Sequence, residues 1–315
     1  MSYKKYYEGG WQSGETGGTP ITPESLNHME QGISDAAPME YAKKVGAPYN
    51  IVDNGYWKIK KEIVNQIGKT EYAYGDAELK MLDRWFGVPG MSIKDGYVTV
   101  FNNDASSYHN LYQRYEVGTL DPNKTYTMAV KLHNGTLCVG SGKTGNESFV
   151  RIYNGNGMHL YIACNREGMD RISIAVQANT SLDIEWVRLF EGEYTAETLT
   201  ECQPQEHATE LLKCQRHYWQ TTRWTGFVGY KGDRTARVFI PLPTIMRVVP
   251  TFSCSVPLRV AANGTSYTDI TVGSVEMRGT MIGLIINDAS AIPKNHVITL
   301  LPTEDNGVIS LSAEI

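Results

Sequence analysis

The chain has 315 residues, a net charge of −5, 41% hydrophobic residues and 20% charged residues. This length suffices for two or three domains that each bury a core, and the composition is that of a globular protein rather than a disordered one. The sequence has no basic block and no apolar run of about 18 residues, which argues against a nucleic-acid partner and against insertion in a membrane.

The N-terminal segment, residues 1–46, is polar and glycine-rich over its first 20 residues, where Trp11 is the large apolar anchor. It lacks the apolar stretch of a secretory signal, so we expect synthesis in a reducing cytoplasm. The stretch TPITPESLNHMEQGISDA predicts a short helix, with Thr22 as the N-cap and Pro23 at the first helical position. Its narrow apolar stripe suits docking or self-association, and it consists of Leu26, Met29 and Ile33.

Residues 47–202 predict a first β domain. Short runs rich in β-branched and aromatic residues, such as GYVTVFN, KTYTMAVKL, RISIAVQA and LDIEWVRLFEG, recur roughly every ten residues. Turn signals such as DPNK, HNG and NGNG separate them. Parallel sheets need crossover helices, and the sequence shows none in this region, so the pattern predicts an antiparallel sandwich of the jelly-roll kind.

Residues 203–219 predict a single short helix between two β-rich regions. Pro204 suits the first helical position, and Glu206 near the start with Lys213 near the end follows the charge order that a helix dipole favours. About four turns of helix are too few to be stable alone, so this helix must pack on other copies of the chain or on its own sandwich. Its apolar residues form a narrow seam with 4-3-4 spacing: His207, Leu211, Cys214 and Tyr218.

Residues 220–315 predict a smaller second β domain, with runs such as ARVFIPLP, TDITVGSVEMRG, TMIGLIIND and VISLSAEI. Pro250 and Pro257 interrupt the run MRVVPTFSCSVPLRVAA, and proline confines a strand to a sheet edge or a bulge. The expected fold class is therefore mainly β, with an antiparallel jelly-roll sandwich, a short helix and a small C-terminal β sandwich.

Four separated stretches carry a family resemblance, in the same order along the chain. They are WQSGETGGTPITPESLNHMEQGI, YNIVDNGYWKIKKEIVNQIGKTEYAYGDAELKMLDRW, IEWVRLFEGEYTAE with ELLKCQRHYWQ, and IPLPTIMRVVPTFSCS. Together they resemble the tail-fibre and receptor-binding proteins of bacteriophages. In that family, an N-terminal attachment segment precedes a carbohydrate-module-like jelly roll, a neck helix and a C-terminal tip domain.

The resemblance implies a homotrimer in the virion tail, assembled in the bacterial host cytoplasm. The neck helices would meet at a three-fold axis, with the seam of His207, Leu211, Cys214 and Tyr218 facing that axis. The N-terminal segment would attach to tail or baseplate proteins, and the head would recognise a bacterial surface polysaccharide. A purely structural tail component without host binding is the alternative, and a fibre-borne glycan hydrolase is a further one.

The sequence predicts no catalytic site, cofactor or resident metal. Its seven histidines are scattered, and neither a zinc motif nor a nucleophile elbow is present. His207, Cys214 and His217 share a helix face, where copies of one histidine around a three-fold axis could bind a transition metal, although packed or solvated side chains are the favoured interpretation. The charged pair Asp83 and Arg84 in the stretch LDRW is interpreted as surface or capping groups. The five cysteines lack CxxC spacing and are expected to be free thiols: Cys138, Cys164, Cys202, Cys214 and Cys254.

The predicted glycan site lies in the stretch HYWQTTRWTGFVGYKGDR, residues 217–234. Saccharides stack on flat aromatic faces while polar side chains fix their hydroxyl groups, and this stretch has the densest mix of both residue types. The alternative is that its two tryptophans belong to the core of a single chain. The candidate ligand-binding residues are Trp219, Arg223, Trp224 and Tyr230.

Overall fold

The computed structural model describes residues 50–75, 79–115, 119–121, 123–135, 138–141, 150–155, 157–164, 171–196, 198–199, 204–222, 226–232, 235–287, 289–304 and 307–314. The chain divides into two compact units, and one of them contains Ile51–Glu193 together with Cys202–Ile315. The other contains Met1–Asn50 and Tyr194–Glu201, and its described part includes a turn in which the Leu199 amide donates to the Thr195 carbonyl at 2.9 Å. The helix predicted near Thr22 lies outside the described residues.

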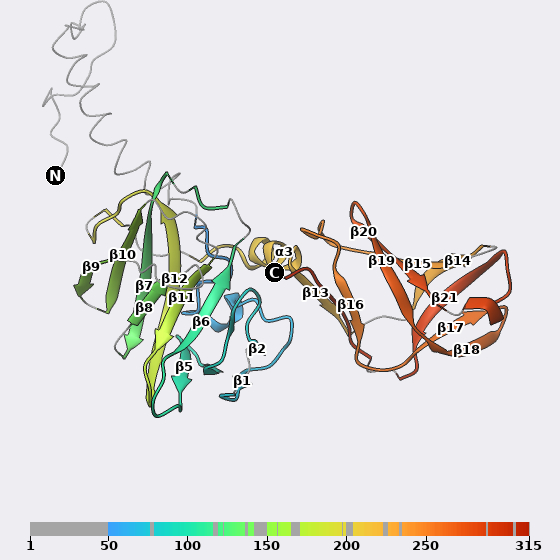
Figure 1. Cartoon of the computed structure of the whole chain (residues 1–315), viewed down its shortest axis with the longest axis horizontal. Helices are drawn as coiled ribbons and strands as arrows, with labels where there is room; N and C mark the ends of the chain where they lie inside the picture. Colours follow the sequence, from blue (N-terminus) through green and yellow to red (C-terminus); the bar gives the residue numbers. More distant parts are fainter. Residues whose placement is uncertain are drawn as a thin grey trace, which may run out of the picture. The chain divides into compact units, whose positions relative to one another are not determined.

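The strands of residues 51–193 form what we call the first sandwich (Figure 1). Among the described residues, one of its sheets has the strand order β1-β4-β5-β12-β7-β10-β9 and the other has the order β2-β3-β6-β11-β8. Neighbouring strands pair antiparallel, as in β12 with β7 and β11 with β6. The elements are η2 (Lys60–Glu62), β1 (Glu71–Tyr72), β2 (Leu79–Lys80), β3 (Phe86–Gly87), β4 (Gly90–Ile93), β5 (Val98–Asn102), β6 (His109–Arg114), β7 (Thr125–Asn134), β8 (Cys138–Ser141), β9 (Val150–Gly155), β10 (Met158–Cys164), β11 (Arg171–Val176) and β12 (Thr180–Glu191).

The alternating residue pattern explains why these segments are strands. In β5, Val98 and Val100 are completely buried while Thr99 between them is half-buried, because successive side chains point to opposite faces of a strand. The long strands β7 and β12 place Met128 opposite Leu189, and both side chains are buried. These residues belong to one continuous hydrophobic core that also contains Trp57 and Trp85, so the first sandwich has a core of its own.

Helix α3 (His207–Gln215) follows the first sandwich and is shorter than the predicted helix of residues 203–219. Glu206 is its N-cap residue, so Pro204 precedes the helix rather than opening it. At the other end, the His217 amide donates to the Cys214 carbonyl at 2.9 Å, and Tyr218 pairs with Ser312 in a sheet. The prediction was wrong about Tyr218, because strand pairing competes successfully with continuation of the helix.

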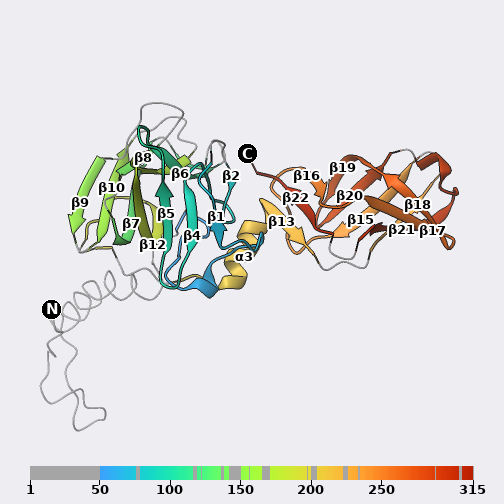
Figure 2. The ribbon, with the colours of Figure 1, turned by 90° about the horizontal axis from the view of Figure 1, so that it is seen from below.

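The strands after α3 form what we call the second sandwich (Figure 2). Among the described residues, a small sheet has the order β13-β22-β16 and a larger one has the order β18-β17-β21-β14-β15-β20-β19. The hydrophobic core between them is separate from that of the first sandwich and includes Val238, Leu284 and Leu311. The elements are β13 (Tyr218–Thr221), β14 (Phe227–Lys231), β15 (Ala236–Pro241), β16 (Thr251–Cys254), β17 (Leu258–Ala262), β18 (Thr265–Ile270), β19 (Val272–Arg278), β20 (Met281–Ile286), η3 (Ala289–Ala291), β21 (His296–Pro302) and β22 (Ile309–Ser312).

The predicted fold class is confirmed: the described part of the chain is mainly β, with antiparallel sheets in a sandwich-like arrangement. The prolines act as expected from their missing N–H group. Pro250 immediately precedes β16, which lies at the edge of its sheet, and Pro257 separates β16 from β17. The run that the sequence showed as one interrupted strand is therefore two strands in two different sheets.

Candidate functional site

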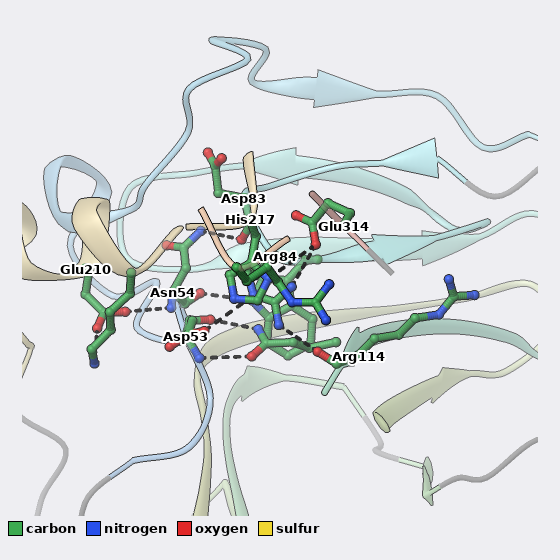
Figure 3. Close-up of polar contacts among 12 residues, drawn as sticks. Asp53, Asn54, Asp83, Arg84, Arg114, Glu210, His217 and Glu314 are labelled. Carbon is green, nitrogen blue, oxygen red and sulfur yellow. Dashed lines mark hydrogen bonds and ion pairs between the residues drawn. The ribbon is translucent and has the colours of Figure 1, made fainter. Parts of the chain in front are cut away.

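The candidate site is a group of polar residues that we call the junction cluster: Asp53, Asn54, Lys80, Asp83, Arg84, Glu210, His217 and Glu314. Figure 3 labels these residues except Lys80. The residues come from the first sandwich, from α3 and its C-terminal end, and from the residues that follow β22. Segments far apart in the sequence therefore meet here. The contacts below show how each side chain is held.

Buried Asn54 is the centre of the junction cluster. Its side-chain amide donates to the carbonyl oxygens of Val64 at 2.8 Å and Asp83 at 3.0 Å, while its Oδ1 accepts the Val64 amide at 2.9 Å. Its own carbonyl accepts the indole N–H groups of Trp57 at 2.8 Å and Trp85 at 3.0 Å. Asn54 has a φ of 51°, in the left-handed region that asparagine tolerates better than most residues. Asparagine at this position thus satisfies both the backbone conformation and the surrounding donors and acceptors.

Arg84 connects the first sandwich to the segment after β22. Its side chain is only 2% exposed, and its Nη1 donates to Glu314 Oε2 at 2.7 Å. Its Nη2 donates to the Arg114 carbonyl at 2.6 Å, and its Nε lies 3.4 Å from Asp53 Oδ2. Arg84 also adopts a left-handed φ of 72°, which is costly for a residue with a large side chain. The guanidinium is thus buried with two carboxylates and a carbonyl as partners, which buried charge requires.

Burial sets the protonation behaviour of the two aspartates. Desolvation raises the pKa of Asp53, and the nearby Arg84 guanidinium partly opposes this increase. Desolvation likewise raises the pKa of Asp83, against the charge of Lys80 and hydrogen bonds from Gln66. The Gln66 amide donates to Asp83 Oδ2 at 2.6 Å, and its Nε2 donates to Asp83 Oδ1 at 2.8 Å. Both carboxylates are therefore held by fixed donors.

Helix α3 joins the junction cluster through its buried face. Glu210 Oε2 accepts the Asn54 amide at 2.6 Å, and Glu210 Oε1 accepts from Lys213 Nζ at 2.9 Å. One turn further along the same face, Cys214 is completely buried, and this burial raises the pKa of its thiol well above the ordinary value. The helix therefore packs against the first sandwich of its own chain, which was one of the two alternatives that the sequence left open.

Glu314 holds two cations. Besides its bond to Arg84, its carboxylate lies 3.4 Å from Lys80 Nζ. The same Lys80 ammonium lies 3.1 Å from the centre of the Tyr218 ring, a cation–π arrangement. Burial lowers the pKa of Lys80, although the charge of Glu314 opposes the decrease. Lys80 thus connects strand β2 both to Glu314, the second residue after β22, and to Tyr218, the first residue of β13.

His217 is the neutral member of the junction cluster. Its Nδ1 is buried without a hydrogen-bond partner among the described residues, and it lies 4.0 Å from Glu314 Oε2, beyond hydrogen-bond distance. Burial, together with the positive charges of Arg84 and Arg247, lowers the pKa of His217 to about 2. The geometric proximity to Glu314 therefore does not make an ion pair at neutral pH, because the imidazole is uncharged.

These contacts indicate what the junction cluster can do. A catalytic carboxylate has to reach a substrate, whereas the carboxylates of Asp53, Asp83 and Glu314 are covered by protein and already bound to nitrogen donors. The cluster therefore holds the first sandwich, α3 and the second sandwich together. The interpretation of Asp83 and Arg84 as surface groups was wrong, because both are at most 2% exposed. The signal was available in the sequence: this pair lies between Leu82 and Trp85, within an apolar run.

The residues of the predicted glycan site have different environments. Trp219 is half-buried and packs against the core of the second sandwich, as the single-chain alternative proposed. Tyr230 is 49% exposed on β14. Arg223 and Trp224 lie outside the described residues. The structure therefore separates Trp219 from the exposed Tyr230 instead of placing both on one exposed surface.

The four residues of the predicted trimer seam do not form one exposed stripe on a helix. His207 and Leu211 are half-buried on α3, whereas Tyr218 lies on β13 beneath Lys80. Cys214 is completely buried within the single chain. The large apolar residue that α3 exposes is Leu212, at 44%. The contacts of α3 with its own chain include the bond between Glu210 and the Asn54 amide.

The larger sheet of the second sandwich has an exposed face around Tyr230. On this face Tyr230 pairs with Val297 of β21 on one side and with Arg237 of β15 on the other. Val228, two residues before Tyr230 on the same strand, is 59% exposed, and Val297 is 66% exposed. The Tyr230 hydroxyl donates to Asn295 Oδ1 at 3.1 Å. We call Val228, Tyr230, Arg237, Asn295 and Val297 the tyrosine face.

Comparisons with known proteins add little to this geometry. No family profile and no curated protein matches the chain. A solved structure with some likeness is the N-terminal domain of an adhesin from Streptococcus gordonii, at 10% sequence identity and a TM-score of 0.14. The match covers 73% of this chain and 58% of the adhesin domain, and a TM-score this low carries no argument. Within the described ranges, no helix is long and apolar enough to cross a membrane, and no group of three or more His, Cys, Asp or Glu side chains is placed to hold a metal ion.

Proposed function

We propose that the chain is a receptor-binding protein of a bacteriophage tail fibre and that it recognises a bacterial surface glycan. The order of its elements supports this proposal. The stretch IEWVRLFEG, which resembles the last strand of the fibre jelly roll, lies in β12, the last strand of the first sandwich. The stretch ELLKCQRHYWQ contains the end of α3 and the start of β13, and IPLPTIMRVVPTFSCS extends from β15 to β16.

The observation that carries glycan recognition is the tyrosine face. Its aromatic ring is exposed on a paired strand rather than on a loop, so the side chain has a fixed base. The exposed Val228 and Val297 extend the apolar surface on which a pyranose ring stacks, and Arg237 and Asn295 bring hydrogen-bonding groups beside it. Aromatic and polar groups that converge in this way are the arrangement expected of a saccharide-binding surface.

The test of glycan recognition compares two exposed tyrosines. The purified full chain is screened on an array of bacterial surface polysaccharides, and affinity for the best ligand is then measured for Tyr230→Ala and Tyr108→Ala. Tyr108 is 59% exposed but lies in the first sandwich, so it is the matched control. We expect Tyr230→Ala to weaken binding about tenfold with an unchanged melting temperature, and Tyr108→Ala to have no effect. Normal binding by Tyr230→Ala would exclude the tyrosine face as the site.

We further propose that the chain assembles as a homotrimer, which attaches to the tail through its N-terminal segment. The residue of α3 available for contact with other copies is Leu212, which is 44% exposed. Leu212→Glu would place one negative charge from each chain near a shared axis, so we expect it to convert the trimer to monomer in light scattering. The control is Val297→Glu, which changes an exposed apolar residue of the second sandwich. A wild-type mass equal to one chain at micromolar concentration would contradict the trimer.

A purely structural tail component is the second candidate, and the junction cluster favours it. A buried network of Asp53, Arg84 and Glu314 serves to hold two sandwiches in a fixed relationship, which a protein that transmits force requires. The same array distinguishes the two candidates, because a structural component binds no polysaccharide. Release of reducing sugar ends from a bound polysaccharide would instead indicate a hydrolase.

A further inference from the structure

The residues that follow β22 leave their sheet and return to the first sandwich. Strand β22 pairs with both β13 and β16, so its position belongs to the second sandwich. Immediately afterwards, the Ala313 amide donates to the His217 carbonyl at 2.7 Å, and the Ala313 carbonyl accepts from Arg247 Nη1 at 2.9 Å. The next residue, Glu314, binds Arg84 and Lys80 of the first sandwich. Ala313 thus contacts the end of α3 and Arg247 of the second sandwich, whereas Glu314 contacts the first sandwich.

We propose that Ala313–Glu314 acts as a latch that couples the two sandwiches into one cooperative folding unit. Each sandwich has a separate hydrophobic core, and among the described residues the two sandwiches are joined by hydrogen bonds and ion pairs such as those of Gln66 with Tyr218 and of Arg84 with Glu314. Coupling then depends on a small number of directional interactions. Among them, the Glu314 carboxylate is the one that binds two cations of the first sandwich.

We expect the remaining polar contacts between the two sandwiches to break when the latch opens. Gln66 Nε2 donates to the Tyr218 carbonyl at 2.8 Å, and Gln220 Nε2 donates to the Gln66 carbonyl at 3.0 Å. These are neutral hydrogen bonds between partly buried groups, which water can replace at little net cost. The Arg84 guanidinium is different, because it is almost fully covered and would keep as an ion pair only the longer, 3.4 Å contact with the Asp53 carboxylate if Glu314 moved away. Opening of the junction is therefore opposed mainly where Glu314 meets Arg84.

Helix α3 provides a second connection between the two sandwiches besides the latch. Glu210 fastens the helix to the Asn54 amide of the first sandwich, and the Arg216 carbonyl at its end accepts the Arg247 amide at 2.9 Å. Arg247 in turn holds the Ala313 carbonyl. The segment from α3 to β13 and the latch thus restrain the same end of the second sandwich from two directions. If the latch is released, α3 and the chain leading into β13 still tether the second sandwich, so the two sandwiches separate without either losing its core.

The experiment uses calorimetry of the full chain with Glu314→Gln, and Glu304→Gln as the matched control on an exposed loop of the second sandwich. We expect wild type and Glu304→Gln to unfold in one transition. Glu314→Gln is expected to unfold in two transitions, the earlier one displaced downward by about 5 °C or more. Hydrogen exchange of the Ala313 amide is measured in parallel and is expected to accelerate in Glu314→Gln, while the amides of β5 remain protected.

Two results would overturn the latch. One is a wild-type protein that already unfolds in two independent transitions. The other is a Glu314→Gln protein that keeps a single transition at the wild-type temperature. If Glu314→Gln fails to fold, Lys80→Gln supplies the comparison, because it removes the longer ion pair of Glu314 and the contact of Lys80 with Tyr218 while the pair with Arg84 stays in place. Two transitions in Lys80→Gln, closer together than those expected for Glu314→Gln, would support the latch. A single transition at the wild-type temperature in Lys80→Gln would count against it.

Discussion

Arg84 Nη1 lies 2.7 Å from Glu314 Oε2, although the two residues are 230 positions apart in the chain. Their side chains are 2% and 9% exposed. A buried ion pair of this kind adds little stability relative to apolar residues, whereas removing one partner costs about 3–5 kcal/mol. Single substitutions in the junction cluster should therefore have large effects, and the first prediction concerns its central residue.

Asn54→Asp changes one atom of the side chain and should strongly destabilise the protein at neutral pH. The new carboxylate oxygen would face the carbonyl oxygens of Val64 and Asp83, which now accept hydrogen bonds from the amide. We expect a loss of about 3–5 kcal/mol at pH 7 in urea unfolding. Burial raises the pKa of such a carboxyl, so the loss grows as pH rises through the folded pKa and is partly recovered at pH 4, where a protonated oxygen donates again.

Asn263→Asp is the control for this prediction. Asn263 also has a left-handed φ, of 50°, but it is exposed in a turn. We expect a change within about 0.5 kcal/mol at either pH. Equal effects at Asn54 and Asn263 would mean that backbone conformation, rather than the hydrogen bonds of Asn54, determines the loss.

Gly229 of β14 should not accept a side chain. A Cβ atom at this position would lie 1.9 Å from the Arg237 carbonyl oxygen and 2.7 Å from Val238 Cα, both of which are backbone atoms of the paired strand. Gly229→Ala therefore requires β14 and β15 to move apart, and we expect it to destabilise the second sandwich by about 2–4 kcal/mol. At nearby Gly232 the same Cβ would be 3.8 Å from its closest neighbours, so Gly232→Ala is expected to be nearly neutral. Thermal unfolding of both variants tests this difference.

His217 should make the protein less stable in mild acid. Its folded pKa is about 2, below its ordinary value of 6.5, so the unfolded chain takes up a proton on this residue as pH falls below 6.5 while the folded chain does not. Between pH 6.5 and pH 4.5, this difference amounts to about 2–3 kcal/mol of lost stability. His217→Gln should remove that part of the pH dependence.

The comparison between wild type and His217→Gln isolates the imidazole. The raised pKa values of Asp53 and Asp83 act in the opposite direction, because their folded carboxyls bind protons more readily as pH falls, but they are present in both proteins. Unfolding free energies are measured in urea at the two pH values. The same loss between pH 6.5 and 4.5 in both proteins would show that His217 is not the group responsible.

Cys214 should resist alkylation in the native protein. It is completely buried, and this burial raises the pKa of its thiol, whereas the thiolate is the reactive form. Cys254 is half-buried and should react faster with iodoacetamide. Peptide mapping by mass spectrometry after native and denaturing labelling gives both rates. Labelling of Cys214 at the rate of Cys254 in the native state would contradict the packing of α3 on the first sandwich.

The strands could be predicted from the sequence because each reflects a local pattern. The run GYVTVFN is rich in β-branched and aromatic residues, which predicted a strand, and in the structure VTVFN alternates buried and half-buried residues. The helix was located correctly, but its C-terminal boundary was not. Whether Tyr218 continues the helix or pairs with Ser312 depends on a strand more than 90 positions away, and local sequence does not record that partner.

The candidate site was less predictable for the same reason. No local pattern connects Arg84 to Glu314, and Arg84 was interpreted as a surface or capping group. The seam on α3 was visible, but its meaning was ambiguous, because a narrow apolar stripe can face another copy or its own chain. The burial of Glu210 beside Cys214 decides this in favour of the chain's own sandwich. The signal available in the sequence was the carboxylate of Glu210 on the same helix face as Cys214.

The separation of Arg84 and Glu314 along the chain has a consequence for synthesis on the ribosome. At roughly 5–20 residues per second, Glu314 emerges about 10–50 s after Arg84. The first sandwich is complete long before that time, since β12 ends at Glu191. During this interval, Asp53 and the Arg114 carbonyl are the partners already available to the guanidinium. Until Glu314 is synthesised, the Arg84 guanidinium of the nascent first sandwich is therefore incompletely neutralised, and we expect water to solvate it at the surface that Glu314 later covers.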